Sequence, residues 1–255
     1  MRAFWIGLQF LTRISIVKQD NWTEGDFGKS VKFFPLIGAV LGIVYAAIVF
    51  IMYFWLPEKG VELPRHVRSV IMLITPLLLT GGLHCDGFMD TMDGLFSGRS
   101  RERMLEIMKD SRVGSNGVVG FGLLVVVEWA IILDMPSAFL VQAFFVMPII
   151  SRLMMVGAIK LYPYARPEGM GKAFVKHSES WSLMFAAVST AVLLFPTGFN
   201  GLVAAFAAGM FAVFFSGYAV KRLGGLTGDL YGAITTLTEL LVLFVFLVIS
   251  SCNVF

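Results

Sequence analysis

The chain has 255 residues, of which 57% are hydrophobic and only 15% are charged. Soluble domains carry about 25% charged residues, so this composition excludes an ordinary soluble domain. Apolar runs of roughly 20 residues recur and predict a polytopic membrane protein. The net charge of +3 comes without a basic face interleaved with aromatic residues, so we expect no nucleic-acid partner. Cys85 and Cys252 predict no disulfide framework.

The region before the first apolar run is predicted to lie at the membrane surface. Residues 1–16 place apolar and aromatic side chains on one side, which is typical of an interfacial amphipathic helix. This segment is too short to span a bilayer, and Arg13 and Lys18 follow without a small-residue cleavage site, so we expect no cleavable signal peptide. Residues 19–32 are polar and predict a surface loop.

Seven apolar segments are predicted to cross the membrane as helices, namely residues 33–56, 69–83, 113–133, 138–159, 181–195, 202–220 and 230–250. The second is short unless it continues through the polar stretch after it. The charged segment 97–112 predicts a short cytoplasmic helix, and residues 160–180 predict a loop. The expected fold is therefore all-α, with a single membrane domain over residues 1–255 that contacts the lipid bilayer.

The distribution of Lys and Arg predicts the orientation of these helices, because cytoplasmic loops are enriched in positive charge. With the N-terminus inside, the N-terminal segment holds five of these residues, segment 97–112 five and segment 160–180 four. Lys221 and Arg222 add two more on the same side, whereas the opposite side holds three, all within residues 57–68. We therefore expect the polar segments to gather on the cytoplasmic side.

Residues 80–94, TGGLHCDGFMDTMDG, contain three aspartates at spacings of four and three. On a helix, Asp86, Asp90 and Asp93 would share one face. Like charges stacked in this way repel each other, so the pattern favours a bound cation, and a divalent metal with oxygen ligands is the simplest choice. The alternative is a solvated acidic face, which the apolar and glycine neighbours make less favourable.

Three other polar segments are expected to join the aspartates, namely residues 108–117 (MKDSRVGSNG), 162–171 (YPYARPEGMG) and 224–229 (GGLTGD). Phosphoryl transfer needs such residue types, because carboxylates hold Mg²⁺ while Arg and Lys bind the remaining phosphate charge. The candidate metal ligands are Asp86, Asp90, Asp110 and Asp229, and Asp93 is a candidate for either ligand or base. Backbone N–H groups at Gly224, Gly225 and Gly228 are candidates for phosphate binding.

Ionisable residues inside predicted spans are functional candidates, because each costs roughly 2.5–3.5 kcal/mol at the bilayer centre. Arg152 and Glu239 are the strongest of these, and Arg152 either snorkels to the surface or reaches the site. His84 points away from the aspartate face on an ideal helix, so capping, or support of a residue that binds the ligand, is as plausible as catalysis.

Several long motifs resemble the cobalamin synthase family. These are LQFLTRI, FFPLIG, GGLHCDGFMDTMDGLFSGRSRERMLEIMKDSRVG, YARPEGMG and GGLTGD, which together run from the N-terminus into the last span. The resemblance implies an Mg²⁺-dependent adenosylcobinamide-GDP ribazoletransferase in a prokaryotic cytoplasmic membrane. Such an enzyme joins adenosylcobinamide-GDP to α-ribazole or its 5′-phosphate and releases GMP. A homo-oligomer or association with other enzymes of vitamin B12 assembly is left open.

The resemblance also implies roles for individual residues. A ribose hydroxyl would attack the phosphorus nearer the cobinamide, with catalytic roles for Asp90, Asp93 and Lys109. The expected substrate-binding residues are His84, Arg112, Arg152, Arg166, Gly224, Gly225 and Gly228.

Two rival classes remain open at this stage. CDP-alcohol phosphotransferases and aspartate-rich prenyltransferases use similar metal chemistry, but their usual motifs are not matched here. An ion-coupled transporter would place its acids at the midplane of paired broken helices, whereas these acids cluster in or beside cytoplasmic loops.

Overall fold

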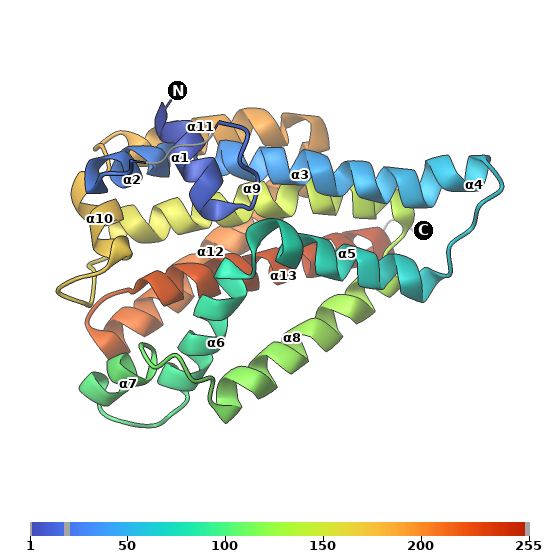
Figure 1. Cartoon of the computed structure of the whole chain (residues 1–255). Helices are drawn as coiled ribbons and strands as arrows, with labels where there is room; N and C mark the ends of the chain where they lie inside the picture. Colours follow the sequence, from blue (N-terminus) through green and yellow to red (C-terminus); the bar gives the residue numbers. More distant parts are fainter. Residues whose placement is uncertain (1, 18–20, 253–255) are drawn as a thin grey trace.

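A computed structural model of the chain describes residues 2–17 and 21–252 and is built from helices (Figure 1). Within these residues, β structure is limited to a single parallel bridge between Tyr164 and Leu226. The expected all-α fold is therefore confirmed. Lys18, counted above among the N-terminal positive charges, and Gln19 lie outside the described residues.

The long apolar helices follow the predicted spans closely. They are α3 (Phe34–Phe50), α5 (Arg65–Thr80), α8 (Ser115–Asp134), α9 (Ser137–Leu161), α11 (Ser182–Leu194), α12 (Gly198–Leu223) and α13 (Gly228–Cys252). Helix α3 continues through the π-helical turn η2 (Ile51–Trp55) into α4 (Leu56–Glu58), and the 3₁₀ turn η3 (Phe195–Thr197) joins α11 to α12. The remaining helices are α1 (Arg2–Leu11), α2 (Glu24–Ser30), η1 (Val31–Phe33), α6 (Leu83–Leu95), α7 (Arg101–Ile107) and α10 (Met170–His177).

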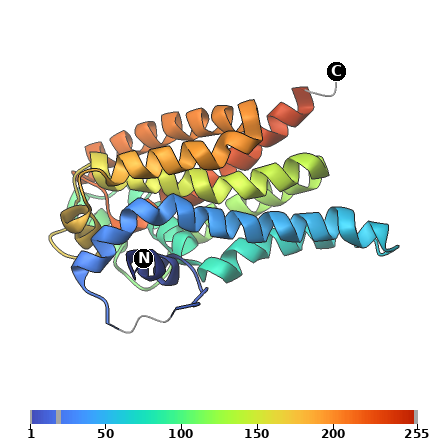
Figure 2. The ribbon, with the colours of Figure 1, turned by 90° about the horizontal axis from the view of Figure 1, so that it is seen from above.

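The number of membrane crossings differs from the predicted seven when it is judged by helix length and apolarity. Five stretches of the described chain qualify, or six if α5 and α6 together form one bent span. One stretch, Ser182–Leu223, covers both α11 and α12, although the backbone turns at Gly198, where φ is 57°. Figure 1 and Figure 2 show that α12 runs back from this turn towards the end of the molecule at which α11 begins, so the chain reverses here.

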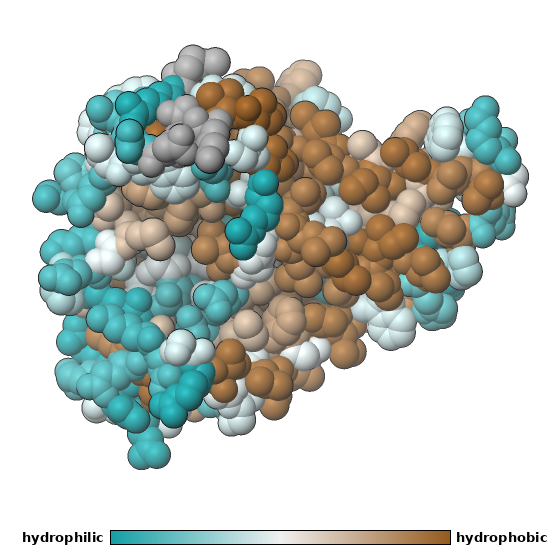
Figure 3. All heavy atoms as spheres, in the orientation of Figure 1, coloured by the Kyte–Doolittle hydropathy of each residue, from teal (hydrophilic) through white to brown (hydrophobic). Residues whose placement is uncertain are grey.

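The surface divides into polar and apolar zones. Figure 3 shows hydrophilic residues gathered at the end of the molecule that carries α2, α7 and α10, and hydrophobic residues over the middle of α3, α5 and α8. Exposed apolar side chains on the long helices include Leu123, Phe206 and Phe214. A single apolar zone beside a polar end is what a protein embedded in a bilayer presents.

Two segments predicted as loops contain short helices instead. Helix α2 begins with a capping box, in which Thr23 and Asp26 accept from each other's backbone N–H groups. Helix α10 packs on α2, with the Phe27 and Phe174 rings 5.9 Å apart. The loop prediction was wrong because it relied on the mostly polar composition of these segments. The few aromatic residues in them, which pack α2 against α10, were not taken into account.

Helices α3 and α9 pack closely along their length, and two glycines permit this contact. A Cβ atom at Gly38 would lie 2.2 Å from the carbonyl oxygen of Pro148, and one at Gly42 would lie 2.2 Å from that of Phe145. The two glycines are four residues apart, so they form one smooth strip on α3. Such small-residue strips allow backbones in membrane proteins to approach closely.

We expect Gly42→Leu to lower the thermal unfolding temperature of the purified protein, because the new side chain must displace the α9 backbone. Overpacking of this kind typically costs about 1–3 kcal/mol. Gly209→Leu is the matched control, because a Cβ there meets nothing within 4 Å. Equal unfolding temperatures for the two variants would contradict the close α3–α9 contact.

Candidate active site

The aspartates are positioned by a sharp bend between α5 and α6. Gly81 and Gly82 adopt φ values of 65° and 73°, which favour glycine, and the two helices meet at an angle of 93°. The predicted second span therefore ends at Thr80, and the aspartates lie on a separate helix. This bend turns α6 away from α5 and towards α13.

Helix α6 then packs tightly on the start of α13. A Cβ atom at Gly87 would lie 2.8 Å from the backbone oxygen of Asp229, and one at Gly232 would lie 3.0 Å from that of His84. This contact brings Asp90 within electrostatic range of Asp229 and Asp86. Three of the predicted metal ligands are therefore neighbours.

Asp229 is the acid in this group that already has a cationic partner. Arg166 donates from Nη2 to Oδ2 of Asp229 at 2.7 Å, and the hydroxyl of Thr227 donates to the same oxygen at 3.2 Å. The loop that carries Arg166 is held by backbone hydrogen bonds of 2.8 Å from Leu226 to Pro163 and from Ala165 to Leu226. The predicted meeting of segments 162–171 and 224–229 is thus observed.

Asp86 and Asp90 carry no hydrogen-bond or ion-pair partner on their side chains within the described residues. Asp86 lines a cavity of about 190 Å³ together with His84, Gly228 and Asp229. His84 is buried, and its Nε2 atom has no partner in the described part of the chain. His84 therefore faces the same cavity as the acids, whereas ideal helical geometry had pointed it away from them.

The donor set suits Mg²⁺, although the side chains are not closed around an ion. No group of three His, Cys, Asp or Glu side chains among the described residues is near enough to hold a metal. Mg²⁺ usually keeps several waters and binds one or two protein carboxylates plus substrate phosphate oxygens. Two unpartnered carboxylates, Asp86 and Asp90, beside a third on Asp229 fit that demand.

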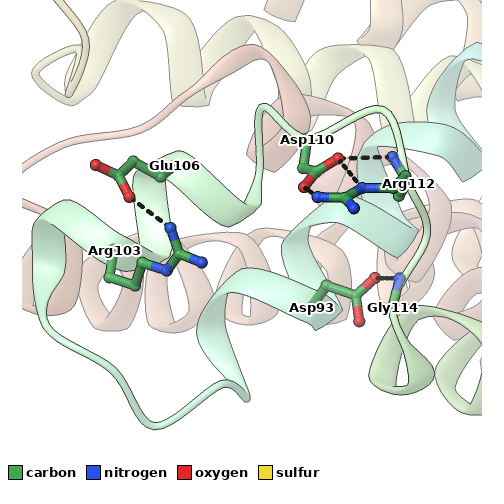
Figure 4. Close-up of polar contacts among 6 residues, drawn as sticks. All are labelled: Asp93, Arg103, Glu106, Asp110, Arg112 and Gly114. Atoms are coloured by element: carbon green, nitrogen blue, oxygen red, sulfur yellow. Dashed lines mark hydrogen bonds and ion pairs between the residues drawn. The ribbon is translucent and has the colours of Figure 1, made fainter.

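Asp93 is placed differently from the other two aspartates of α6. Its carboxylate accepts from the backbone N–H of Gly114 at 2.7 Å and of Gly117 at 2.9 Å, and the side chain is buried (Figure 4). These N–H groups belong to the start of α8, so Asp93 caps that helix. This placement favours a structural role for Asp93 over the predicted choice of ligand or base.

Asp110 and Arg112 form an exposed pair with each other (Figure 4). Arg112 donates from Nη2 to Oδ2 of Asp110 at 2.8 Å and from Nε to Oδ1 at 3.1 Å. These hydrogen bonds hold the pKa of the Asp110 carboxyl down to about 2. The acids within electrostatic range of Asp90 include Asp229, Asp86 and Asp93, whereas Asp110 is exposed and paired with Arg112. The structure therefore does not bring Asp110 into the predicted ligand set.

Arg152 is buried inside the helix bundle, and its ion-pair partner is on α13 rather than among the aspartates of α6. It is 0% exposed and forms an ion pair with Glu239 of α13, which also accepts from Ser151 at 3.0 Å. Pairing of buried charges is the usual way such groups are accommodated in membranes. The structure therefore gives Arg152 a partner within the helix bundle, and its predicted contact with substrate stays a prediction.

The three glycines of the GGLTGD segment have different surroundings. Gly224 ends α12 in a left-handed conformation with φ of 76°, and its N–H donates to Val220. Gly225 allows the neighbouring loop to approach, because a Cβ there would lie 2.7 Å from the nitrogen of Ala165. Gly228 alone lines the cavity of the acids, so it is the glycine placed to meet a phosphate.

A second hollow, of about 270 Å³, carries basic side chains. Arg101, Lys109 and Arg166 line it together with Glu102 and Glu106. Arg101 also donates from Nε to the carbonyl of Leu223 at 2.7 Å, so it ties α7 to the end of α12. Sequence reasoning singled out Lys109 and Arg166 but missed Arg101, although it lies in the long central motif.

Comparison with known proteins identifies the family. The model of the cobalamin-5-phosphate synthase family matches residues 3–247. A relative from Desulfitobacterium hafniense is 37% identical over 250 residues, covering 95% of each chain, and one from Shigella dysenteriae is 38% identical over 257 residues, covering 95% of this chain and 98% of its own. A third, from Fusobacterium nucleatum, is 34% identical and covers 98% and 99% of the two chains.

All three relatives are named adenosylcobinamide-GDP ribazoletransferase, which is an enzyme, and no solved protein structure matches this chain. The expected family, inferred above from motifs, is confirmed by a match over nearly the whole chain. The protein therefore belongs to the cobalamin-5-phosphate synthase family of membrane transferases in cobalamin biosynthesis.

Proposed function

We propose that this protein joins adenosylcobinamide-GDP to α-ribazole or its 5′-phosphate and releases GMP. The family match carries the choice of substrates, and the group of Asp86, Asp90 and Asp229 supports the chemistry. In the reaction, the ribose 3′-oxygen forms a bond to the phosphorus nearer the cobinamide. The bond from that phosphorus to the bridging oxygen breaks, and GMP leaves with the bridging oxygen.

The proposed cofactor is Mg²⁺, held by Asp86 and Asp229 with Asp90 beside them. When bound, it would neutralise and orient the oxygens of the diphosphate. In this proposal Arg166 has two roles, because it forms an ion pair with Asp229 and also lines the basic hollow. From that hollow, Arg166 and Lys109 bind phosphate oxygens of the departing nucleotide.

Asp90 is the carboxylate that we assign to accept the proton of the attacking hydroxyl. No hydrogen-bond donor among the described residues stabilises its charge, whereas Asp93 holds two backbone N–H groups and Asp229 holds Arg166. A base needs a free lone pair within reach of the substrate. Of the four acids of α6 and the start of α13, Asp86 and Asp90 are the two whose oxygens have no partner within the described part of the chain, and Asp86 is assigned to the metal.

The proposal places the site on the cytoplasmic side of a prokaryotic membrane. The polar end that carries α2, α7 and α10 holds most of the Lys and Arg residues, and positive charge favours the cytoplasm. The phosphate-binding groups lie at the same end. Nucleotide substrates would therefore reach the site without crossing the bilayer.

Purified protein supplied with Mg²⁺, adenosylcobinamide-GDP and α-ribazole 5′-phosphate should release GMP at the rate at which the cobamide product forms. Removal of the metal by a chelator should stop both the release of GMP and the formation of the cobamide product. Release of GMP without the acceptor would indicate hydrolysis rather than transfer. Ion flux in proteoliposomes without substrate, with no GMP formed, would favour the transporter alternative.

Asp86→Asn and Asp90→Asn should each lower kcat by about 10²–10⁴-fold, the range attributed to general acid–base groups and comparable charge stabilisation. Asp110→Asn should retain most activity, because Asp110 is paired with Arg112 outside the cluster. Asp134→Asn, at an exposed position beside Arg65, controls for the loss of one carboxylate. A large loss in Asp110→Asn alone would return Asp110 to the ligand set.

Asp93→Ala should lower the unfolding temperature, because it leaves the N–H groups of Gly114 and Gly117 without their acceptor. Loss of a helix cap costs about 0.5–2 kcal/mol. The variant should also show an unchanged pH profile for the activity that remains, because Asp93 is not the base in this proposal. A shifted acidic limb of that profile, with stability unchanged, would assign the proton transfer to Asp93.

A further inference from the structure

A second, larger cavity also reaches Asp86 but is not lined by Asp229. It measures about 540 Å³ and is bounded by the end of α1, the bend between α5 and α6, and α8. Asp86 lines both this cavity and the one that contains Asp229. Asp86 is therefore accessible from two cavities, and a transfer between two substrates requires two binding sites near the reacting groups.

The walls of this cavity are mostly apolar. Phe10, Leu77, Met89 and Phe121 supply two aromatic rings, an aliphatic side chain and a thioether. Flat aromatic heterocycles pack well against such side chains. The cavity is also of the size that holds drug-sized ligands, roughly 300–1,000 Å³, which suits a nucleoside monophosphate and is far too small for a corrinoid nucleotide.

Arg13 lines this cavity, and its guanidinium group is unpaired within the described residues. No hydrogen bond or ion pair of its side chain is found within the described residues. Its backbone N–H donates to the carbonyl of Leu79 at 2.7 Å, and its Nε would lie 2.2 Å from a Cβ at Gly81, so the guanidinium lies against the bend. Arg13 is thus held beside the apolar walls by its own backbone.

We infer that this cavity binds the aromatic acceptor nucleoside and that Arg13 binds the acceptor's 5′-phosphate. The inference rests on the proposed function. The base lies against Phe10 and Phe121, the ribose faces Asp86, and the phosphate meets the planar fork of Arg13. The nucleotide of the other substrate belongs in a separate place, the hollow lined by Lys109 and Arg166.

Arg13→Gln tests this assignment by comparing two acceptors, α-ribazole 5′-phosphate and α-ribazole, in a sugar detergent that contains no phosphate. A hydrogen bond to a charged group contributes about 1.5–3 kcal/mol, so kcat/KM for the phosphorylated acceptor should fall about 10- to 100-fold, chiefly through KM. The value for α-ribazole should stay unchanged. Arg13→Lys, which keeps the charge but not the fork, should fall between wild type and Arg13→Gln.

Arg222→Gln is the matched control, because it removes one exposed positive charge near the end of α12, away from the cavity. Equal losses for both acceptors in Arg13→Gln would show that Arg13 only supports the bend, and would overturn the inference. A loss that appears only in anionic lipid vesicles would assign Arg13 to a lipid headgroup and would also overturn it. If wild type forms no product with either acceptor, the proposed function itself fails.

Phe121→Ala tests the base-binding half of the same inference. It should raise KM for both acceptors to a similar degree, because the base is common to them, while KM for adenosylcobinamide-GDP stays the same. Phe206→Ala, which removes an exposed ring from α12, is the control. A rise in KM for adenosylcobinamide-GDP instead would place the other substrate in this cavity.

Discussion

The contact between α6 and α13 is the constraint on which the rest of the site depends. Gly87 and Gly232 bring two backbones together where any side chain would separate them. Because the contact lies beside Asp86 and at Asp229 itself, it sets the separation of acids that are 143 residues apart in sequence. The bend at Gly81 and Gly82 also brings the aspartates to α13, because a straight continuation of α5 would carry them away from that helix.

The apolar bundle fixes α13 against rotation, and thereby fixes Asp229. The pair of Arg152 and Glu239 links α9 to α13 inside the bundle, with Ser151 donating to the same carboxylate. Removing one partner of a buried pair typically costs about 3–5 kcal/mol, because the other charge is left uncompensated. Rotation of α13 about its axis would break this pair. Because Glu239 and Asp229 lie on the same helix, the pair also fixes the direction in which Asp229 faces.

Much of the fold could be predicted from the sequence because apolar length is a local property. The bounds of α8, α9 and α13 match the predicted spans to within a few residues, and the motifs identified the family. The roles of single acids were harder to predict. Nothing local distinguishes Asp93 from Asp86, because the N–H groups that bind Asp93 come from a helix that starts 22 residues later. The docking of α2 and α10 likewise depends on rings far apart in the chain.

Three aspartates on one helical face repel each other, and the structure stabilises them in different ways. The N-terminus of α8, where backbone N–H groups concentrate positive charge, satisfies Asp93. Asp229, on α13, forms an ion pair with Arg166. Asp86 and Asp90 are then the acids of this group without a side-chain partner among the described residues, and Asp86 lines two cavities. The Mg²⁺ proposed to bind Asp86 and Asp229 would lower the repulsion that these carboxylates exert on Asp90, because it would add positive charge beside all three.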